Sequence, residues 1–227
     1  MTEEKKPKKE KKEKKEAKLE PKSMSVKIIF TAPMLGTAPA NESIYEDFIG
    51  KKSSDAEKVE QELASLPQEE LIEKGKTVFH RIDEEDDQPM LYDYQVKGFI
   101  KEAFRVKVEF GVIKIGGKDI SMWNIDRIID NYVYVYPREI PLILPEGGEM
   151  DDCVRPLRAK TMRGERVALA CSERVPKGTI INIKVEWLHP DLEKHIINAL
   201  NYGAKKGIGQ WRNSGMGRFR WETVAVA

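Results

Sequence analysis

Apolar and polar positions alternate along several segments of this 227-residue chain, which is the pattern of half-buried β-strands. These segments are rich in β-branched and aromatic residues, and Pro or Gly separates many of them. We expect strands at residues 25–32, 77–80, 106–113, 131–136, 154–160, 167–172, 180–188 and 218–224.

Two segments repeat apolar residues at helical spacing instead. One runs from Asp93, a potential N-cap, to Arg105, and the other opens at Pro190. Their predicted core-facing stripes are Val96, Phe99, Ile100, Ala103 and Phe104, then Leu192, Ile196, Ala199 and Leu200. Weaker patterns suggest helices at 43–49, 55–74 and 122–130. Gly98 lies inside the first helix, where glycine costs up to about 1 kcal/mol relative to alanine, so we expect a strand or a ligand to approach it closely.

Charge is unevenly distributed along the chain, although the formal net charge is only +1. Residues 1–23 hold 10 Lys and 6 Glu and almost nothing to bury, which predicts a disordered tail, either a basic arm or a solubilising segment. Residues 24–227 then form a single domain, with an acidic insertion at about 41–93 and a β-rich insertion at about 114–172. The first insertion has 16 acidic and 6 basic residues, whereas 154–220 has 14 basic and 5 acidic, an asymmetry that hints at nucleic-acid contact.

Other classes of protein are disfavoured by what the sequence lacks. Cys153 and Cys171 are too few for a disulfide framework, there is no zinc pattern, and no apolar run is long enough to span a membrane. The carboxylates at 84–87 are more typical of a solvated turn than of a metal site. We therefore expect a cytoplasmic protein without metal, cofactor or membrane partner.

A glycine-rich basic stretch at residues 202–221 holds five glycines, five Lys or Arg side chains and Trp211 before its closing Trp221. Glycine exposes backbone N–H groups, the cations add charge, and an aromatic face can stack on a base. This combination predicts a polyanion site. The alternative is a long glycine hairpin that only turns the chain.

The order of these features resembles the RAMP superfamily, the repeat-associated RNA-binding proteins of CRISPR effector complexes, and especially their backbone subunits. A first strand leads into a Pro/Gly-rich segment at 32–39, and residues 94–105 are similar to the family's Ser-Leu-Lys-Gly helix. Glu173-Arg-Val-Pro-Lys-Gly-Thr resembles its Val-Pro-x-Gly-Thr motif, and 207–219 resembles its C-terminal glycine-rich loop. Together these landmarks span nearly the whole body of the chain, although none is specific alone.

The resemblance implies an α+β, ferredoxin-like (βαββαβ) antiparallel sheet with helices on one face, elaborated by insertions. It also implies a non-catalytic protein that binds single-stranded nucleic acid, with RNA favoured. The chain departs from the family at 91–95, where the usual Pro-Gly-Ser-Ser is absent. It is also similar to solitary chains of tailed bacteriophages, which would place it in the cytoplasm of a bacterial host.

The candidate nucleic-acid-binding residues lie on the first helix, on the 154–172 hairpin and in the glycine-rich stretch. They are Lys97, Lys101, Arg105, Arg155, Arg158, Arg163, Lys205, Lys206, Gly207, Gly209, Gln210, Trp211, Arg212, Asn213, Ser214, Gly215, Gly217 and Arg218. Together they are expected to line one groove, with phosphates at the cations and at the glycine N–H groups.

Three alternatives remain open. One is a phage interaction protein that mimics or docks on a CRISPR-type defence complex. Another is a metal-independent RNA endonuclease using His80 or His195. The opposite charges of the two segments also permit head-to-tail self-association.

Overall fold

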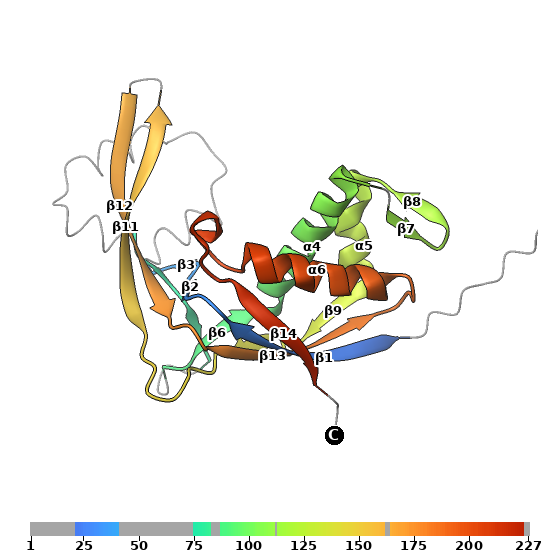
Figure 1. Cartoon of the computed structure of the whole chain (residues 1–227), viewed down its shortest axis with the longest axis horizontal. Coiled ribbons are helices and arrows are strands. Elements are labelled where there is room, and N and C mark those ends of the chain that lie inside the picture. The colour runs from blue at the N-terminus through green and yellow to red at the C-terminus, as the bar shows by residue number, and fades with distance from the viewer. Residues whose placement is uncertain (1–20, 41–74, 83–86, 112, 162–163, 225–227) are drawn as a thin grey trace, which may run out of the picture.

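The computed structural model describes residues 21–40, 75–82, 87–111, 113–161 and 164–224, with side chains except at 157–168 (Figure 1). Most of the predicted tail, the helical patterns at 43–49 and 55–74, and the acidic residues 84–86 lie outside these ranges. The first strand begins at Lys22, which pairs with Trp187, so it starts before the point where the tail was expected to end.

A four-stranded antiparallel sheet forms the centre of the protein, in the order β14-β1-β13-β9. Its strands are β1 (Lys22–Phe30), β9 (Val133–Tyr136), β13 (Ile180–Trp187) and β14 (Phe219–Val224). In chain order these strands and the two helices that cover them run β1, α4, β9, β13, α6, β14. This is the βαββαβ connectivity of a ferredoxin-like fold, as predicted.

One face of this sheet carries the core because alternate residues of its strands point the same way. Val26 pairs with Ile183 and Ile28 with Ile181, and all four are buried. The helices α4 (Asp93–Glu109) and α6 (Leu192–Lys206) lie across that face (Figure 1), and both predicted apolar stripes are buried beneath them. The stripes therefore predicted the packing of both helices correctly.

The first helix differs from the prediction at both ends. Its N-cap is Tyr92, whose backbone N–H donates to Gln95 Oε1 at 2.9 Å, whereas Asp93 Oδ1 accepts from the N–H of Tyr94. The helix continues to Glu109, so the strand expected at 106–113 is wrong for most of its length. A β-branched run favours strand, but Val108 packs against the core as the helix continues, and tertiary packing overrides that preference.

A small layer covers the outer edge of α4. It consists of the hairpin β7 (Ile113–Ile115) and β8 (Lys118–Ile120), the turn η1 (Met122–Asn124) and α5 (Ile125–Tyr132). The helix predicted at 122–130 is thus confirmed as η1 and α5, and the Gly116–Gly117 turn joins β7 to β8.

Two further sheets flank the ferredoxin core. One has the order β10-β6-β5, from β10 (Glu139–Pro141), β6 (Pro89–Tyr92) and β5 (His80–Arg81). The other contains the long hairpin β11 (Asp151–Thr161) and β12 (Gly164–Val175). β2 (Met34–Leu35) and β4 (Thr77–Val78) pair with β12, and β3 (Ala38–Pro39) pairs with β4. In Figure 1 this hairpin projects beyond the sheet toward the side on which the helices lie.

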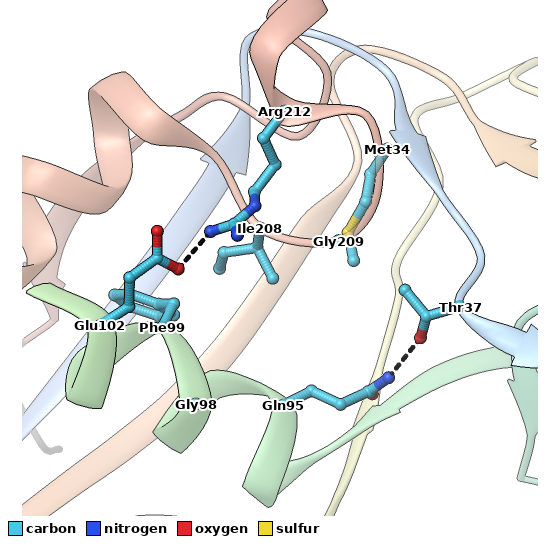
Figure 2. A pocket seen from close by; sticks show the side chains of 9 residues that line it. All are labelled: Met34, Thr37, Gln95, Gly98, Phe99, Glu102, Ile208, Gly209 and Arg212. Atoms are coloured by element: carbon cyan, nitrogen blue, oxygen red, sulfur yellow. Dashed lines mark hydrogen bonds and ion pairs between the residues drawn. The ribbon is translucent and has the colours of Figure 1, made fainter. Parts of the chain in front are cut away.

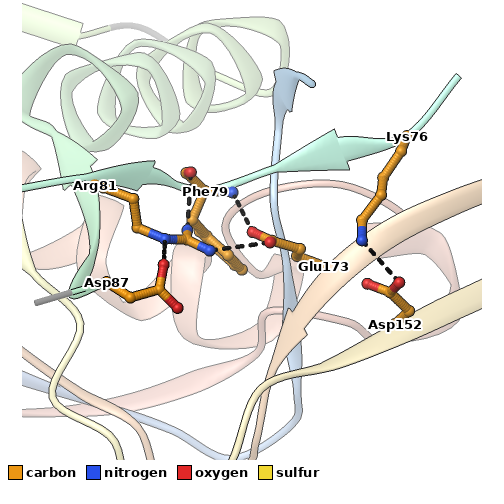
Figure 3. A network of polar contacts seen from close by, with 6 residues as sticks. All are labelled: Lys76, Phe79, Arg81, Asp87, Asp152 and Glu173. Carbon is orange, nitrogen blue, oxygen red and sulfur yellow. Dashed lines mark hydrogen bonds and ion pairs between the residues drawn. The ribbon is translucent and has the colours of Figure 1, made fainter. Parts of the chain in front are cut away.

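Polar contacts fix the base of this hairpin (Figure 3). Glu173 accepts hydrogen bonds from the Phe79 N–H and from Arg81 Nη2, both at 2.9 Å, and Lys76 Nζ lies 2.8 Å from Asp152 Oδ2. Glu173 is largely buried, so its ion pair with Arg81 is less screened by solvent than a surface pair. The base of the projecting hairpin is therefore tied to β4 and β5.

Candidate nucleic-acid interface

Most glycines of the 202–221 stretch are packed against other parts of the chain. A Cβ on Gly217 would lie 1.8 Å from the Ile208 carbonyl oxygen, and one on Gly203 would lie 2.9 Å from Phe99. Gly207 would meet the Met216 carbonyl oxygen at 2.4 Å. Only glycine fits at these positions, so close internal packing accounts for their presence.

Several glycine N–H groups are also occupied. Gly207 donates to the Gly203 carbonyl at 2.7 Å, Gly215 to Arg212 at 2.9 Å, and Gly217 to Pro33 at 2.7 Å. The expectation that these three N–H groups are open to phosphate is therefore wrong. The stretch is a folded structure with its own hydrogen bonds, and the sequence could not show which acceptors lie nearby.

A cleft of about 230 Å³ opens beside this stretch, between α4 and the connection after β1 (Figure 2). Its lining comes from three parts of the chain that are distant in sequence: Met34, Thr37, Gln95, Gly98, Phe99, Glu102, Ile208, Gly209 and Arg212. The structure thus brings two of the predicted site residues, Gly209 and Arg212, against the predicted helix glycine.

Gly98 differs from the packed glycines. It is exposed on α4, and a Cβ at this position would meet nothing within 4 Å. The expectation that a strand of the protein approaches Gly98 is therefore wrong within the described residues. At Gly98 the helix backbone has no side chain and faces the open cleft, so close approach by a ligand stays a prediction.

The polar groups of the cleft are paired with one another (Figure 2). Arg212 Nη1 lies 2.5 Å from Glu102 Oε2, and Gln95 Nε2 donates to Thr37 Oγ1 at 2.7 Å. Tyr202 donates to Glu102 Oε1 at 3.3 Å, and burial together with the Glu102 charge raises the pKa of Tyr202. Arg212 thus already has a carboxylate partner, which an anionic ligand would have to displace.

The three predicted cations of α4 face a different neighbour. Lys101 Nζ lies 2.8 Å and Lys97 Nζ 3.6 Å from Asp130 Oδ1, and Arg105 pairs with Asp126. The Lys101 hydrogen bond is the main cause of the lowered pKa of Asp130. All three cations pair with α5 carboxylates and none lines the cleft beside the glycine-rich stretch, so a groove that they share with this stretch stays a prediction.

Arg155 of β11 connects the hairpin to the glycine-rich stretch. Its Nη1 donates to Ser172 Oγ and its Nη2 to Gln210 Oε1, both at 2.9 Å. Its guanidinium carbon lies over the Trp211 ring, 5.3 Å from the centroid. Three predicted residues therefore form one cluster, on a side of the stretch that does not line the cleft.

The remaining predicted residues are distributed around the stretch. Lys206 Nζ donates to Asn213 Oδ1 at 3.1 Å, whereas Lys205, Ser214 and Arg218 are exposed. Arg158 is at a position opposite Val167 in the β11–β12 ladder, but its side chain and all of Arg163 lie outside the described part. Whether these residues bind a ligand stays a prediction.

Each histidine contacts other residues of the fold, and catalysis by His80 or His195 stays a prediction. His195 is buried, with Nδ1 3.1 Å from Lys107 Nζ, and burial with the nearby Lys charges lowers its pKa to about 4. His80 packs against Tyr92, and burial lowers its pKa. His189 Nδ1 accepts from the N–H of Asp191.

The described residues include no group of three His, Cys, Asp or Glu side chains arranged to hold a metal ion. Among the same residues, no helix has the length and apolar character needed to cross a bilayer.

Sequence reasoning missed the residues that complete the cleft. Glu102 and Gln95 lie on a predicted helix, but no periodic signal distinguishes them from other solvated positions. Thr37 and Met34 belong to the Pro/Gly-rich connection that was expected only to end the first strand. For Glu102 alone, its place four residues after Gly98 on the same helical face could have indicated that it lies beside that glycine.

Comparison with known proteins supports the fold. No protein-family model matches the chain, and no curated protein matches it. A chain of a type III-B CRISPR Cmr-β complex bound to cognate target RNA is similar in structure, with a TM-score of 0.51 and 12% identity over 92% of this chain. A chain of a type IV-B CRISPR complex has a TM-score of 0.46 and 9% identity, over 90% of this chain and 91% of that one.

The present chain spans only 62% of the type III-B chain. At such low identity the likeness concerns the fold alone, which this chain shares with a CRISPR complex subunit.

Proposed function

We propose that this chain is a non-catalytic, RAMP-type protein that binds single-stranded nucleic acid, with RNA favoured. The observation that carries the proposal is the cleft at Gly98. A glycine in mid-helix lowers helix stability, no other part of the described chain packs against it, and it faces Gly209 and Arg212 across an open space. A ligand that approaches the helix backbone closely would give this glycine a role.

A sugar–phosphate backbone suits this cleft. Arg212 would exchange Glu102 for a phosphate, and charge-assisted bonds from guanidinium to phosphate are strong. The exposed cations Lys205 and Arg218 stand near the same stretch and would add attraction that depends on salt. Gly98 and Gly209 would leave room for the sugar.

The fold gives independent support. A subunit with the same ferredoxin-like core belongs to a complex bound to target RNA. The landmarks that resemble the RAMP family include the helix with Gly98 and the stretch with Gly209, and these two elements form the cleft.

The test is the affinity for a labelled single-stranded RNA, measured by fluorescence anisotropy over a series of salt concentrations. Arg218→Ala is expected to weaken binding and to reduce the slope of log affinity against log salt by about 1, as for one lost phosphate contact. The matched control is Arg220→Ala, because Arg220 is exposed within the β1–β14 ladder opposite Ile29, whereas the Arg218 guanidinium lies beside Gly215 of the glycine-rich stretch.

Arg220→Ala should leave the salt slope unchanged. Equal effects of the two substitutions would contradict the placement of the site. No binding by the wild-type chain at low salt would contradict nucleic-acid binding itself and would favour the alternative of a protein that binds another protein.

A further inference from the structure

We infer that Trp211 is a stacking site for one nucleobase and that Arg155 is the positioning residue that holds its ring. The inference rests on the proposed function and adds a subsite to it. The cleft at Gly98 would bind sugar and phosphate, whereas the Arg155–Trp211 cluster, on the hairpin side of the glycine-rich stretch, would bind a flat aromatic ring.

The first observation is the burial of a charge that has no counter-charge among the residues that the structure describes. Arg155 is only 5% exposed, yet the two acceptors that it reaches within the described part of the chain, Ser172 Oγ and Gln210 Oε1, are neutral, and its buried Nε has no partner there. A buried cation without a carboxylate is unfavourable unless other groups stabilise it. The Trp211 ring is such a group, because the negative face of an indole attracts a guanidinium.

The second observation is the backbone of Trp211. Five residues between 207 and 217 have positive φ, and four of them are glycines. The fifth is Trp211, with φ of 52°, a conformation that disfavours a large side chain. A residue held in such a region is an observed strain that points to function rather than to turn formation, for which glycine would serve better.

The third observation is exposure. The Trp211 side chain remains 38% exposed although one face of its ring carries the Arg155 guanidinium. An indole that has one face covered by a held guanidinium and keeps this exposure can serve as a preorganised stacking platform, since little rotamer freedom remains to be lost when a ring stacks on it. Every base has a π-face, so this subsite would tolerate all four bases.

The two subsites are close enough to serve one strand. Trp211 is two residues from Gly209 of the cleft, a separation of at most about 7 Å along the chain. Stacked nucleotides rise about 3.4 Å each, so this distance corresponds to one or two nucleotides. A strand whose backbone passes Gly98 could therefore present a neighbouring base to Trp211.

The experiment compares two probes of equal length: an oligouridylate and an abasic strand that has the sugar–phosphate backbone but no bases. Trp211→Ala is expected to weaken binding of the oligouridylate about 5- to 150-fold, the range for loss of one stacked base. It should leave binding of the abasic strand and the salt slope unchanged, because no phosphate contact is lost. Trp211→Phe should retain most of the affinity, and Trp123→Ala, which removes a highly exposed indole elsewhere, should have no effect.

Arg155→Lys tests the positioning role, because lysine keeps the charge but cannot hold Ser172 and Gln210 while covering the ring. It is expected to remove the preference for the oligouridylate over the abasic strand while sparing the affinity for the abasic strand. A purely structural Arg155 would reduce both affinities in proportion. Should Arg155→Lys fail to fold, the exposed Trp211 variants still decide the matter.

Two outcomes separate this inference from the proposed function. If the wild type binds both probes and Trp211→Ala changes neither affinity, or changes both equally, the stacking site is refuted and the binding protein stands. If the wild type binds neither probe, the proposed function fails first.

Discussion

Replacing Gly98 with alanine should strengthen the fold and weaken the binding of nucleic acid. The added methyl group would meet no atom of the described chain within 4 Å, so the folded state accommodates it without strain. Gly98 lies inside α4 and is exposed, which is where the helix preference of alanine over glycine is expressed in full. We expect the free energy of unfolding to rise by about 0.5–1 kcal/mol.

The same methyl group would stand in the cleft that we assign to the sugar–phosphate backbone. Forcing an additional methyl group into a close-packed contact typically costs about 1–3 kcal/mol, which corresponds to a loss of affinity of about 5- to 150-fold. The two effects have opposite signs. A substitution that merely damages the protein would lower both quantities.

The measurements are urea denaturation followed by circular dichroism and anisotropy titration with single-stranded RNA. Gly111→Ala is the control, because Gly111 lies just beyond the same helix and away from the cleft, and its Cβ would meet only the Lys107 carbonyl oxygen at 3.9 Å. Unchanged RNA affinity in Gly98→Ala would refute close approach of the ligand to α4. A decrease in stability would show that the helix needs glycine for a reason of its own.

Two further predictions concern charge. Glu102→Gln is expected to raise RNA affinity several-fold, measured by anisotropy, because it releases Arg212 from its carboxylate partner. The control is Glu109→Gln, which removes the same charge from the exposed end of the helix and should have a smaller effect. Equal gains in affinity would contradict a specific role of Glu102. His195 has a lowered pKa of about 4 in the folded state, chiefly through burial and the nearby Lys107, so the unfolded chain binds its proton more readily. The contribution of His195 should therefore be complete above about pH 6.5 and fall by up to about 3 kcal/mol toward pH 4. Urea denaturation across this range should show a steeper slope in the wild type than in His195→Leu, which retains only the slope from other groups such as His80.

The ferredoxin-like core could be predicted because the spacing of apolar residues along each strand and helix shows which side of that element is buried. Alternation in β13 and the stripes of α4 and α6 identify which residues face the core, and the structure buries them as expected. Residues 106–109 show the limit of this reasoning. Their β-branched character is local, whereas the contact that keeps Val108 helical comes from the rest of the fold.

The candidate site was harder to predict because its partners come from distant segments. Lys97, Lys101 and Arg105 form a line of cations in the sequence, but the carboxylates that pair with them, on α5, lie 21 to 33 residues further along the chain. The sequence reveals a basic helix face and cannot reveal that α5 neutralises it.

The glycines of the 202–221 stretch support function indirectly. A side chain on Gly207 or Gly217 would displace the backbone and one on Gly203 would displace the rings of Phe99 and Phe219, and this packing fixes where the intervening side chains lie. A site works best when its groups need no rearrangement on binding, and a tightly hydrogen-bonded loop supplies that order for Trp211 and Arg212. Substituting the packed glycines would therefore disrupt the loop itself. No described residue packs against Gly98, so a loss of RNA affinity in Gly98→Ala would report on the ligand.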